Sequence, residues 1–269
     1  MQKDRRAMML GGVGMAAAGL AAAALVGCEK KTDSAVTVDA DLELKIRKDL
    51  AERQIEKTIN RYEGLLSAGL VEAAFELFAV SQPDVQADVG FGFYYGPESV
   101  KRLFVGLHGW LELNDQGKLR NGALYIVPNT TGIVEVADDL KTAKGHWLCP
   151  TISTPGSPEK GFSAMPGYAH RVADFIYENG QWKIWHYFVY GILYYPEGKA
   201  WTDPAVYEAE TGKPQDLSWI PEQFQPDAPS DTAAGIGKEA VWRPDRPPTT
   251  VRLPEPYRTF SETFSYARK

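Results

Sequence analysis

The chain has 269 residues, of which 44% are hydrophobic and 12% aromatic, so it can bury one substantial core without requiring a second. Its net charge of −6 gives no general attraction to nucleic acid, and the sequence has no Lys/Arg cluster interleaved with aromatic residues, so we expect no nucleic-acid partner. The two cysteines, Cys28 and Cys149, could form at most one bridge, which excludes a disulfide framework.

Residues 1–28 have the composition of an export signal. A basic start that includes Arg5-Arg6 precedes a weakly apolar Gly/Ala-rich run over residues 7–26. Arg5-Arg6 resembles a twin-arginine (Tat) signal peptide, and Leu25-Val26-Gly27-Cys28 resembles a bacterial lipoprotein box. The resemblance implies cleavage before Cys28, acylation of its sulfur, and a lipoprotein anchored on the outer side of the bacterial cytoplasmic membrane or in the periplasm. A transmembrane anchor is the alternative, and residues 29–40 are predicted to be a polar linker.

Three short helices are predicted before the strands. Apolar residues recur at the spacing of one helical stripe from Leu42 to Ser67, and Gly69 can end this helix. A second helix covers 71–78. A third begins at Gly96-Pro97-Glu98, and its buried stripe comprises Val100, Leu103, Phe104, Leu107 and Leu111.

The strands are predicted at about 123–127, 132–136 and 142–153, followed by a hairpin over 168–195. Asn179-Gly180 suits a type I′ turn, so Glu178 pairs with Gln181. Counting outward, regular alternation puts Arg171, Ala173 and Phe175 on one face with Ile184, His186 and Phe188, and puts Trp185 and Tyr187 on the other. Helices followed by strands predict an α+β domain with a mainly antiparallel sheet over residues 41–200.

The last segment, residues 201–269, is rich in proline yet keeps scattered aromatic residues. Proline at this density prevents regular helix, whereas the aromatic residues are unusual in a disordered linker. We therefore predict an irregular extension that wraps the domain and docks on the outer hairpin face, around Trp185 and Tyr187.

The order of elements resembles the nuclear transport factor two-like superfamily, and its SnoaL-like branch in particular. Three motifs carry the resemblance: RYEGLLSAG (61–69), YYGPESVKRLF (94–104) and YENGQWKIWH (177–186). The resemblance implies a cone in which a curved sheet wraps against helices, with a pocket at its open end. Members include ketosteroid isomerase, scytalone dehydratase, polyketide cyclases and many proteins that only bind or assemble.

The resemblance also implies site residues. Tyr62 stands seven residues before Gly69, as does the tyrosine that donates to the oxyanion in the isomerases, and Asp88 lies near the position of their base. A slip of one residue would turn Asp88 away from the pocket. Arg171, nine residues before Gly180, matches a ligand-facing position. The dehydratase proton-transfer set is missing, because its positions hold Ser67, Tyr125 and Ser153.

We therefore predict that Tyr62, Arg171 and His186 converge on one cavity, with Asp88 or His186 as the base. Tyr125, Trp147 and Phe188 are predicted to contact the ligand. The alternative for these polar residues is a structural role in the core, Arg171 neutralising a buried carboxylate and His186 being a hydrogen-bonded core residue.

These residues favour an exported, cofactor-free isomerase or lyase that moves a proton on a small cyclic or aromatic hydrophobic substrate. The alternative is a noncatalytic lipoprotein that binds a hydrophobic small molecule or mediates assembly. The four histidines form no metal-ligand pattern, so no metal is expected, and a homodimer is left open.

Overall fold

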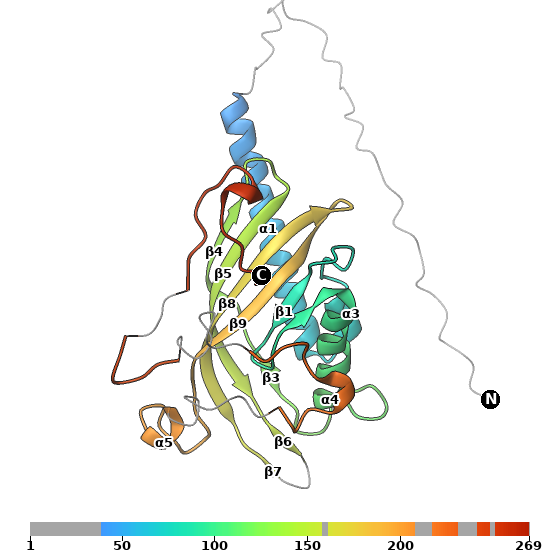
Figure 1. The fold of residues 1–269 in the computed structure, drawn as a ribbon, viewed down its shortest axis with the longest axis vertical. Coiled ribbons are helices and arrows are strands. Elements are labelled where there is room, and N and C mark those ends of the chain that lie inside the picture. Colours follow the sequence, from blue (N-terminus) through green and yellow to red (C-terminus); the bar gives the residue numbers. More distant parts are fainter. Residues whose placement is uncertain (1–38, 158–160, 208–216, 231–240, 248–250, 269) are drawn as a thin grey trace, which may run out of the picture. The chain divides into compact units, whose positions relative to one another are not determined.

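The computed structural model describes residues 39–157, 161–207, 217–230, 241–247 and 251–268 (Figure 1). The export signal with Cys28 lies outside these residues. Within the described ranges, no helix is both long enough and apolar enough to cross a membrane. The compact unit that carries the fold begins at Asp39.

The predicted helices are confirmed, and they form a layer against one face of the sheet (Figure 1). Helix α1 (Ala40–Ser67) buries one stripe that includes Ile55, Ile59 and Tyr62, and Gly69 follows it at a φ of 71°, as a helix-ending glycine should. Helix α2 (Val71–Phe75) is short. The third predicted helix is continuous but mixed, consisting of α3 (Gly96–Lys101), a π-helical turn η1 (Arg102–Leu107) and α4 (His108–Glu112).

The main sheet has the strand order β2-β1-β9-β8-β5-β3, and β4 also pairs with β5. Only the pairing of β1 with β9 is parallel; the other described pairs are antiparallel. The α+β class and the curved, mainly antiparallel sheet are thus as predicted (Figure 1). The bounds are β1 (Gln86–Asp88), β2 (Tyr94–Tyr95), β3 (Tyr125–Ile126), β4 (Thr130–Val136), β5 (Thr142–Ser153), β8 (Met165–Glu178) and β9 (Gln181–Tyr194), while β6 (Gly156–Ser157) and β7 (Gly161–Phe162) form a separate pair.

The β8–β9 hairpin turns where predicted, but its register changes part of the way along. Asn179 and Gly180 both have positive φ, and Glu178 pairs with Gln181. Phe175 then pairs with Ile184, whereas Asp174 pairs with His186, so Trp185 is one extra residue in β9. The rings of Trp185 and His186 stack at 4.3 Å, which shows neighbouring side chains on the same side of the strand. This is a β-bulge, and it reverses the parity of the β9 residues from His186 to Gly191; a second register shift follows at Ile192.

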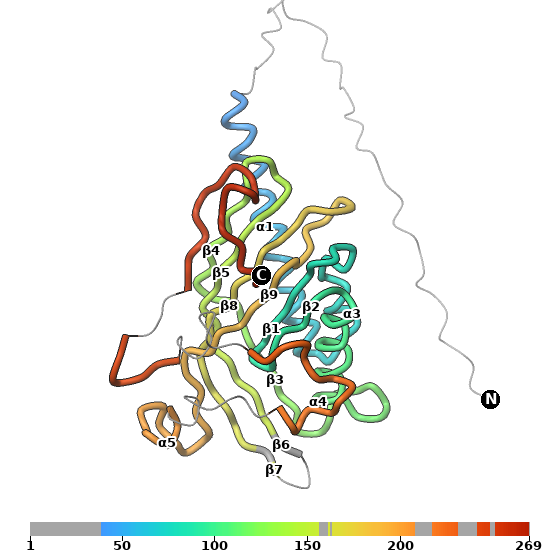
Figure 2. The backbone as a smooth tube through the Cα atoms, in the orientation of Figure 1, coloured from blue at the N-terminus to red at the C-terminus, as the bar shows by residue number. Residues whose placement is uncertain are grey.

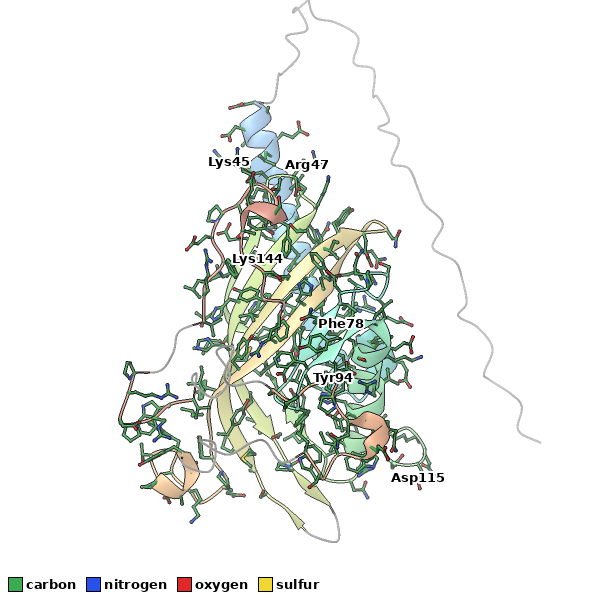
Figure 3. All side chains as sticks on the ribbon, viewed as in Figure 1. Lys45, Arg47, Phe78, Tyr94, Asp115 and Lys144 are labelled. Carbon is green, nitrogen blue, oxygen red and sulfur yellow. The ribbon has the colours of Figure 1, made fainter. Side chains whose placement is uncertain are left out.

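The sheet is covered on both faces, and each face has its own core. The helix-facing core includes Tyr62, Ala173, Ile184 and Tyr187, and Figure 3 labels Phe78 in this layer. The opposite core consists of Phe93, Val172, Phe188 and Tyr190 together with Val251 and Tyr266 of the C-terminal segment. Each strand of the hairpin therefore buries both of its faces, which accounts for the near-continuous apolar sequence.

The described parts of the C-terminal segment include α5 (Pro204–Tyr207) and the 3₁₀ turns η2 (Glu222–Phe224) and η4 (Phe260–Glu262). Figure 2 shows the last, red part running beside the hairpin strands. Trp185 contacts Phe260 with ring centroids 4.9 Å apart. The prediction that Tyr187 faces this segment is wrong, because the bulge turns it inward, where its ring lies 5.2 Å from that of Tyr62.

Candidate active site

Four of the predicted site residues share the helix-facing side of the sheet. Tyr62 reaches it from α1, while Arg171 and Trp147 are paired across β8 and β5 and so point the same way. Tyr125 of β3 interacts electrostatically with Arg171, and the ring of Trp147 packs on that of Phe175. Three of these residues belong to a group of polar side chains that we call the interior polar cluster: Tyr62, Glu63, His108, Glu112, Tyr125, Arg171 and Tyr187.

A buried ion pair is one half of the interior polar cluster. Arg171 is fully buried, and its Nη2 lies 2.9 Å from Oε1 of Glu63, the residue after Tyr62 on α1. Its Nη1 donates to Asn129, and the Tyr187 hydroxyl donates to Glu63 Oε1 at 3.3 Å. Burial raises the pKa of Glu63, although the Arg171 charge opposes this. Burial would lower the pKa of Arg171, but Glu63 raises it overall, so the guanidinium stays charged.

The other half is a histidine oriented by a carboxylate. His108 and Glu112 are four residues apart on α4, so they face the same way, and Nδ1 lies 3.1 Å from Glu112 Oε1. A carboxylate only accepts hydrogen bonds, so Nδ1 carries the proton and a neutral His108 has its lone pair on Nε2. Nε2 is buried and has no hydrogen-bond partner among the described residues. This arrangement orients an imidazole as a proton acceptor.

Aromatic rings surround this histidine. Its ring stacks on Phe104 at 5.7 Å and lies 6.3 Å from Phe91 and 6.2 Å from Tyr125. The π-helical turn η1 ends just before it, and the His108 amide donates to the carbonyl of Leu103 five residues back. Such wide turns change which side chains share a helix face and are frequent at functional sites. Here the turn directly precedes His108.

The tyrosines of the interior polar cluster keep their phenol protons at neutral pH, so each can donate a hydrogen bond. Burial raises the pKa of Tyr62 and of Tyr187, and the charge of Glu63 raises both further. Burial and then Glu63 also raise the pKa of Tyr125, with a smaller contribution from Glu112. Tyr125 therefore interacts with both halves of the cluster, and all three phenols remain protonated.

The bulge overturns the predicted placement of His186 and Phe188. Beyond Trp185, His186 pairs with Asp174 and faces the C-terminal segment, so it does not converge with Tyr62 and Arg171. Phe188 lies on that same side, in the second core. Neither residue reaches the interior polar cluster, because one inserted residue exchanges the two faces of a strand.

Asp88 is also on the face away from the helices. It pairs with Phe188 across β1 and β9, while its neighbour Ala87 belongs to the interior core. Its carboxylate accepts bonds from the Gly90 amide at 2.7 Å and from the Ser230 hydroxyl at 2.7 Å. Burial raises its pKa, opposed first by the Ser230 bond. Asp88 thus fastens a loop and the C-terminal segment, and the structure does not bring it together with Tyr62 and Arg171.

A second charged cluster lies beneath the C-terminal segment, and we call it the tail-covered cluster: Lys144, Asp174, His186 and Ser265. Lys144 Nζ and His186 Nδ1 lie 2.9 and 2.8 Å from the two oxygens of Asp174. The Ser265 hydroxyl and the Tyr266 amide also donate to Asp174. Ser265 Oγ lies 2.7 Å from Asp174 Oδ2 and 3.4 Å from His186 Nδ1, but Nδ1 is itself bonded to Asp174, so this is no nucleophile–base relay. It holds the segment on the sheet.

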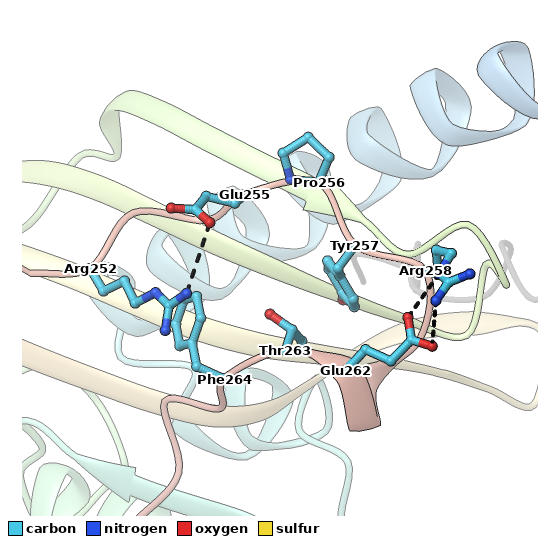
Figure 4. Close-up of a pocket in the computed structure, with 8 residues that line it drawn as sticks. All are labelled: Arg252, Glu255, Pro256, Tyr257, Arg258, Glu262, Thr263 and Phe264. Carbon is cyan, nitrogen blue, oxygen red and sulfur yellow. Dashed lines mark hydrogen bonds and ion pairs between the residues drawn. The ribbon is translucent and has the colours of Figure 1, made fainter.

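The C-terminal segment also has a hollow on its surface, with a volume of about 540 Å³ (Figure 4). Its walls contain two exposed ion pairs, Arg252 with Glu255 and Arg258 with Glu262. Its lining is Arg252, Glu255, Pro256, Tyr257, Arg258, Glu262, Thr263 and Phe264, so it shares no residue with the interior polar cluster. Among the residues with described positions, no group of three or more His, Cys, Asp or Glu could hold a metal ion.

Sequence reasoning missed His108, Glu112 and Glu63. The spacing of His108 and Glu112 was a usable signal, because residues four apart meet on a helix. The sequence signal for Glu63 was weaker. It follows Tyr62 directly, so a helical stripe centred on Tyr62 leaves Glu63 at its edge, and only the position of Arg171 draws it inward.

No family model matches the chain, and no curated protein does. Three solved structures are similar in part. An NTF2-like protein with a cystatin-like fold from Novosphingobium aromaticivorans is 18% identical over 61% of this chain and 94% of its own, with a TM-score of 0.43. The hexachlorocyclohexane dehydrochlorinase LinA-type3 from Novosphingobium barchaimii is 14% identical, covering 58% and 96%, with a TM-score of 0.44. An NTF2-like protein of unknown function from Pseudomonas putida is 15% identical, covering 52% and 86%, with a TM-score of 0.39.

Proposed function

We propose that the chain is an exported, cofactor-free enzyme of the isomerase or lyase kind, which moves a proton on a small cyclic or aromatic substrate. One observation carries the proposal. The buried Nε2 of His108 has no partner in the described part of the chain, while Nδ1 is held by Glu112. An unpaired buried polar atom costs about 1–3 kcal/mol, and the one on His108, unlike those on His146 and His186, belongs to the interior polar cluster.

In the proposed reaction, His108 Nε2 takes a proton from a carbon beside a carbonyl group. The C–H electron pair forms a carbon–carbon double bond, and the carbonyl oxygen gains the negative charge. Glu112 stabilises the imidazolium that forms. The proton then returns to another carbon, which is an isomerisation. In an elimination, the carbonyl group re-forms, the former C–H pair makes the new double bond to the next carbon, and the leaving group departs from that carbon with the electron pair of its own bond.

The remaining residues of the interior polar cluster would stabilise the oxyanion. Tyr62, Tyr125 and Tyr187 keep their protons, and Arg171 keeps its charge. Tyr187 already donates to Glu63, so Tyr62, Tyr125 and Arg171 are the proposed donors to the oxyanion. The aromatic rings around His108 favour a flat, apolar substrate. Glu63 holds Arg171 in place, which is the structural role the sequence allowed for that arginine.

Solvent deuterium exchange tests the proposal. A panel of small cyclic and aromatic ketones, beginning with 2-tetralone, is followed by NMR in D₂O, where loss of the α-proton signal reports proton abstraction. His108→Gln should slow exchange about 10²-fold to 10⁴-fold, the usual contribution of a general base. His170→Gln is the matched control, because His170 bonds to His146 on the opposite face of the sheet.

Equal exchange rates for His108→Gln and the wild type would refute His108 as the base. Ligands that bind, as seen by quenching of tryptophan fluorescence, but exchange no faster than in buffer would instead support the noncatalytic binding protein.

A further inference from the structure

Helix α1 has an exposed apolar stripe in addition to its buried one. Leu42, Ile46 and Leu50 are 51%, 48% and 54% exposed. They recur every fourth residue, so they lie on one face of the helix. Ile46 and the fully buried Ile55 are nine residues apart, a rotation of about 900°, which places them on opposite sides of the helix. The stripe therefore points directly away from the sheet.

The part of α1 that carries this stripe projects beyond the ends of the neighbouring strands (Figure 1). Figure 3 labels Lys45 and Arg47 on the same turns. On its sheet-facing side the helix is fastened by Lys48, whose Nζ lies 3.0 Å from Asp138 in the β4–β5 turn. The helix is thus held on one side, and another helix can approach along its other side.

Charged residues in line with the stripe have opposite signs beyond its two ends. Asp39 and Glu43 lie at its beginning, and Arg53 and Lys57 lie just past its end. None of these four has an ion-pair partner within the described ranges. If two copies of α1 meet antiparallel with Ile46 on the two-fold axis, Leu42 faces Leu50 and Asp39 faces Arg53. A parallel pair would instead bring like charges together.

We propose that this stripe is the contact surface for a second copy of the chain, with the two α1 helices antiparallel. The acidic residues at its beginning disfavour an anionic membrane as the occupant. Self-complementary charge and a self-paired central residue are the properties of a two-fold interface. The 15 residues from Asp39 to Arg53 span only about 22 Å, so the contact is smaller than a standard interface and forms a reversible dimer.

Cysteine crosslinking of the full chain tests both the occupant and the direction. All variants carry Cys28→Ser and keep the buried Cys149. Ile46→Cys should form a disulfide-linked dimer on mild oxidation, because the two copies of this residue meet on the axis. Leu42→Cys alone should not, because its two copies are separated by about 12 Å along the axis, too far for a disulfide. Leu42→Cys with Leu50→Cys should crosslink again.

Lys45→Cys is the matched control, since it is exposed on the same turns but away from the stripe. Arg53→Asp should reduce Ile46→Cys crosslinking several-fold, and adding Asp39→Arg should restore it. The proposal would be overturned if Ile46→Cys crosslinked no faster than Lys45→Cys. It would also be overturned if Leu42→Cys alone crosslinked at the same rate as Ile46→Cys, because that result indicates a parallel pair of helices. Circular dichroism melting of each variant separates these results from misfolding.

Discussion

The ion pair between Lys144 and Asp174 gives the sharpest stability prediction. Both side chains are 0% exposed, and Nζ lies 2.9 Å from Oδ1. Around the ammonium group, the rings of Phe260 and Phe264 have centroids at 4.2 and 4.7 Å (Figure 3 labels Lys144). Burial lowers the pKa of Lys144, and Asp174 opposes this. Burial would raise the pKa of Asp174, but His186 and Lys144 together lower it, so the pair is held ionised.

We predict that Lys144→Met lowers the free energy of unfolding by about 3–5 kcal/mol, because it leaves a buried carboxylate without its cation. Total stability is on the order of 5–15 kcal/mol. For a domain of this size each kcal/mol shifts the melting temperature by about 2–4 °C, so we expect a loss of about 6–20 °C.

Urea unfolding, with midpoint and slope both fitted, measures the effect. The control is Lys45→Met, which removes an ion pair whose side chains are 69% and 66% exposed. That variant should change stability by well under 1 kcal/mol, because water screens exposed pairs. If the two lysine variants lose the same small amount, the tail-covered cluster does not hold the C-terminal segment in the way that we infer.

Four further predictions address other parts of the chain. Burial and then His170 lower the pKa of His146 to about 4, so between pH 4 and 6.5 the unfolded state binds more protons than the folded state. Stability should therefore fall as the pH drops through this window. His146→Gln should make the stability measured by urea unfolding depend less on pH. Deleting residues 251–269 should lower the melting temperature and increase binding of a hydrophobic dye, because it uncovers the second core; an unchanged melting curve would contradict this. Mass spectrometry of the membrane fraction should find acylated Cys28 at the N-terminus, and an unmodified chain that begins elsewhere would contradict it. Tyr62→Phe should slow deuterium exchange about 10²-fold to 10³-fold while the melting curve stays unchanged; full activity would remove Tyr62 from the site.

The parts of the fold that follow from local chemistry could be predicted from the sequence. The hairpin turn needs only two residues that tolerate positive φ, and Asn179-Gly180 supplies them. The helix that ends at Gly69 and the one that begins at Pro97 rest on equally local rules. The α+β class could be predicted from these local features alone, without knowledge of contacts between distant parts of the chain.

The bulge could not be predicted in the same way, because its determinants are distant in sequence. Trp185 fits a regular strand as well as its neighbours do. Its position in the structure is fixed by Asp84, which accepts a bond from its Nε1 at 2.8 Å, and by Phe260 in the C-terminal segment. His186 is likewise held by Asp174. Strict alternation therefore failed at Trp185, where tertiary contacts outweighed it, and the register shifts once more at Ile192.

Part of the candidate site could be predicted, because some of its residues lie where the alternation along the strand is regular. Tyr62, Arg171, Tyr125 and Trp147 came from positions that no bulge disturbs, and they lie on the helix-facing side. His108 lies on the third helix, and the resemblance assigned no role to that position. Its partner was visible in the sequence, but the significance of the pair appears only when Nε2 is seen to be buried.

Strand β8 separates two buried charged clusters that differ in how completely they are satisfied. It sends Arg171 inward and Asp174 outward, and Asp174 is bonded by four donors. Among the described residues, buried atoms without a hydrogen-bond partner are concentrated in the interior polar cluster, where they belong to Glu63, His108, Glu112 and Arg171. The tail-covered cluster has only Nε2 of His186, and the others are Nδ1 of His146 and the Thr151 hydroxyl. A cluster kept for stability would be expected to lose such atoms, since each costs about 1–3 kcal/mol. The uneven distribution therefore favours a functional role for the interior polar cluster and a structural role for the tail-covered cluster, which holds the C-terminal segment on the sheet.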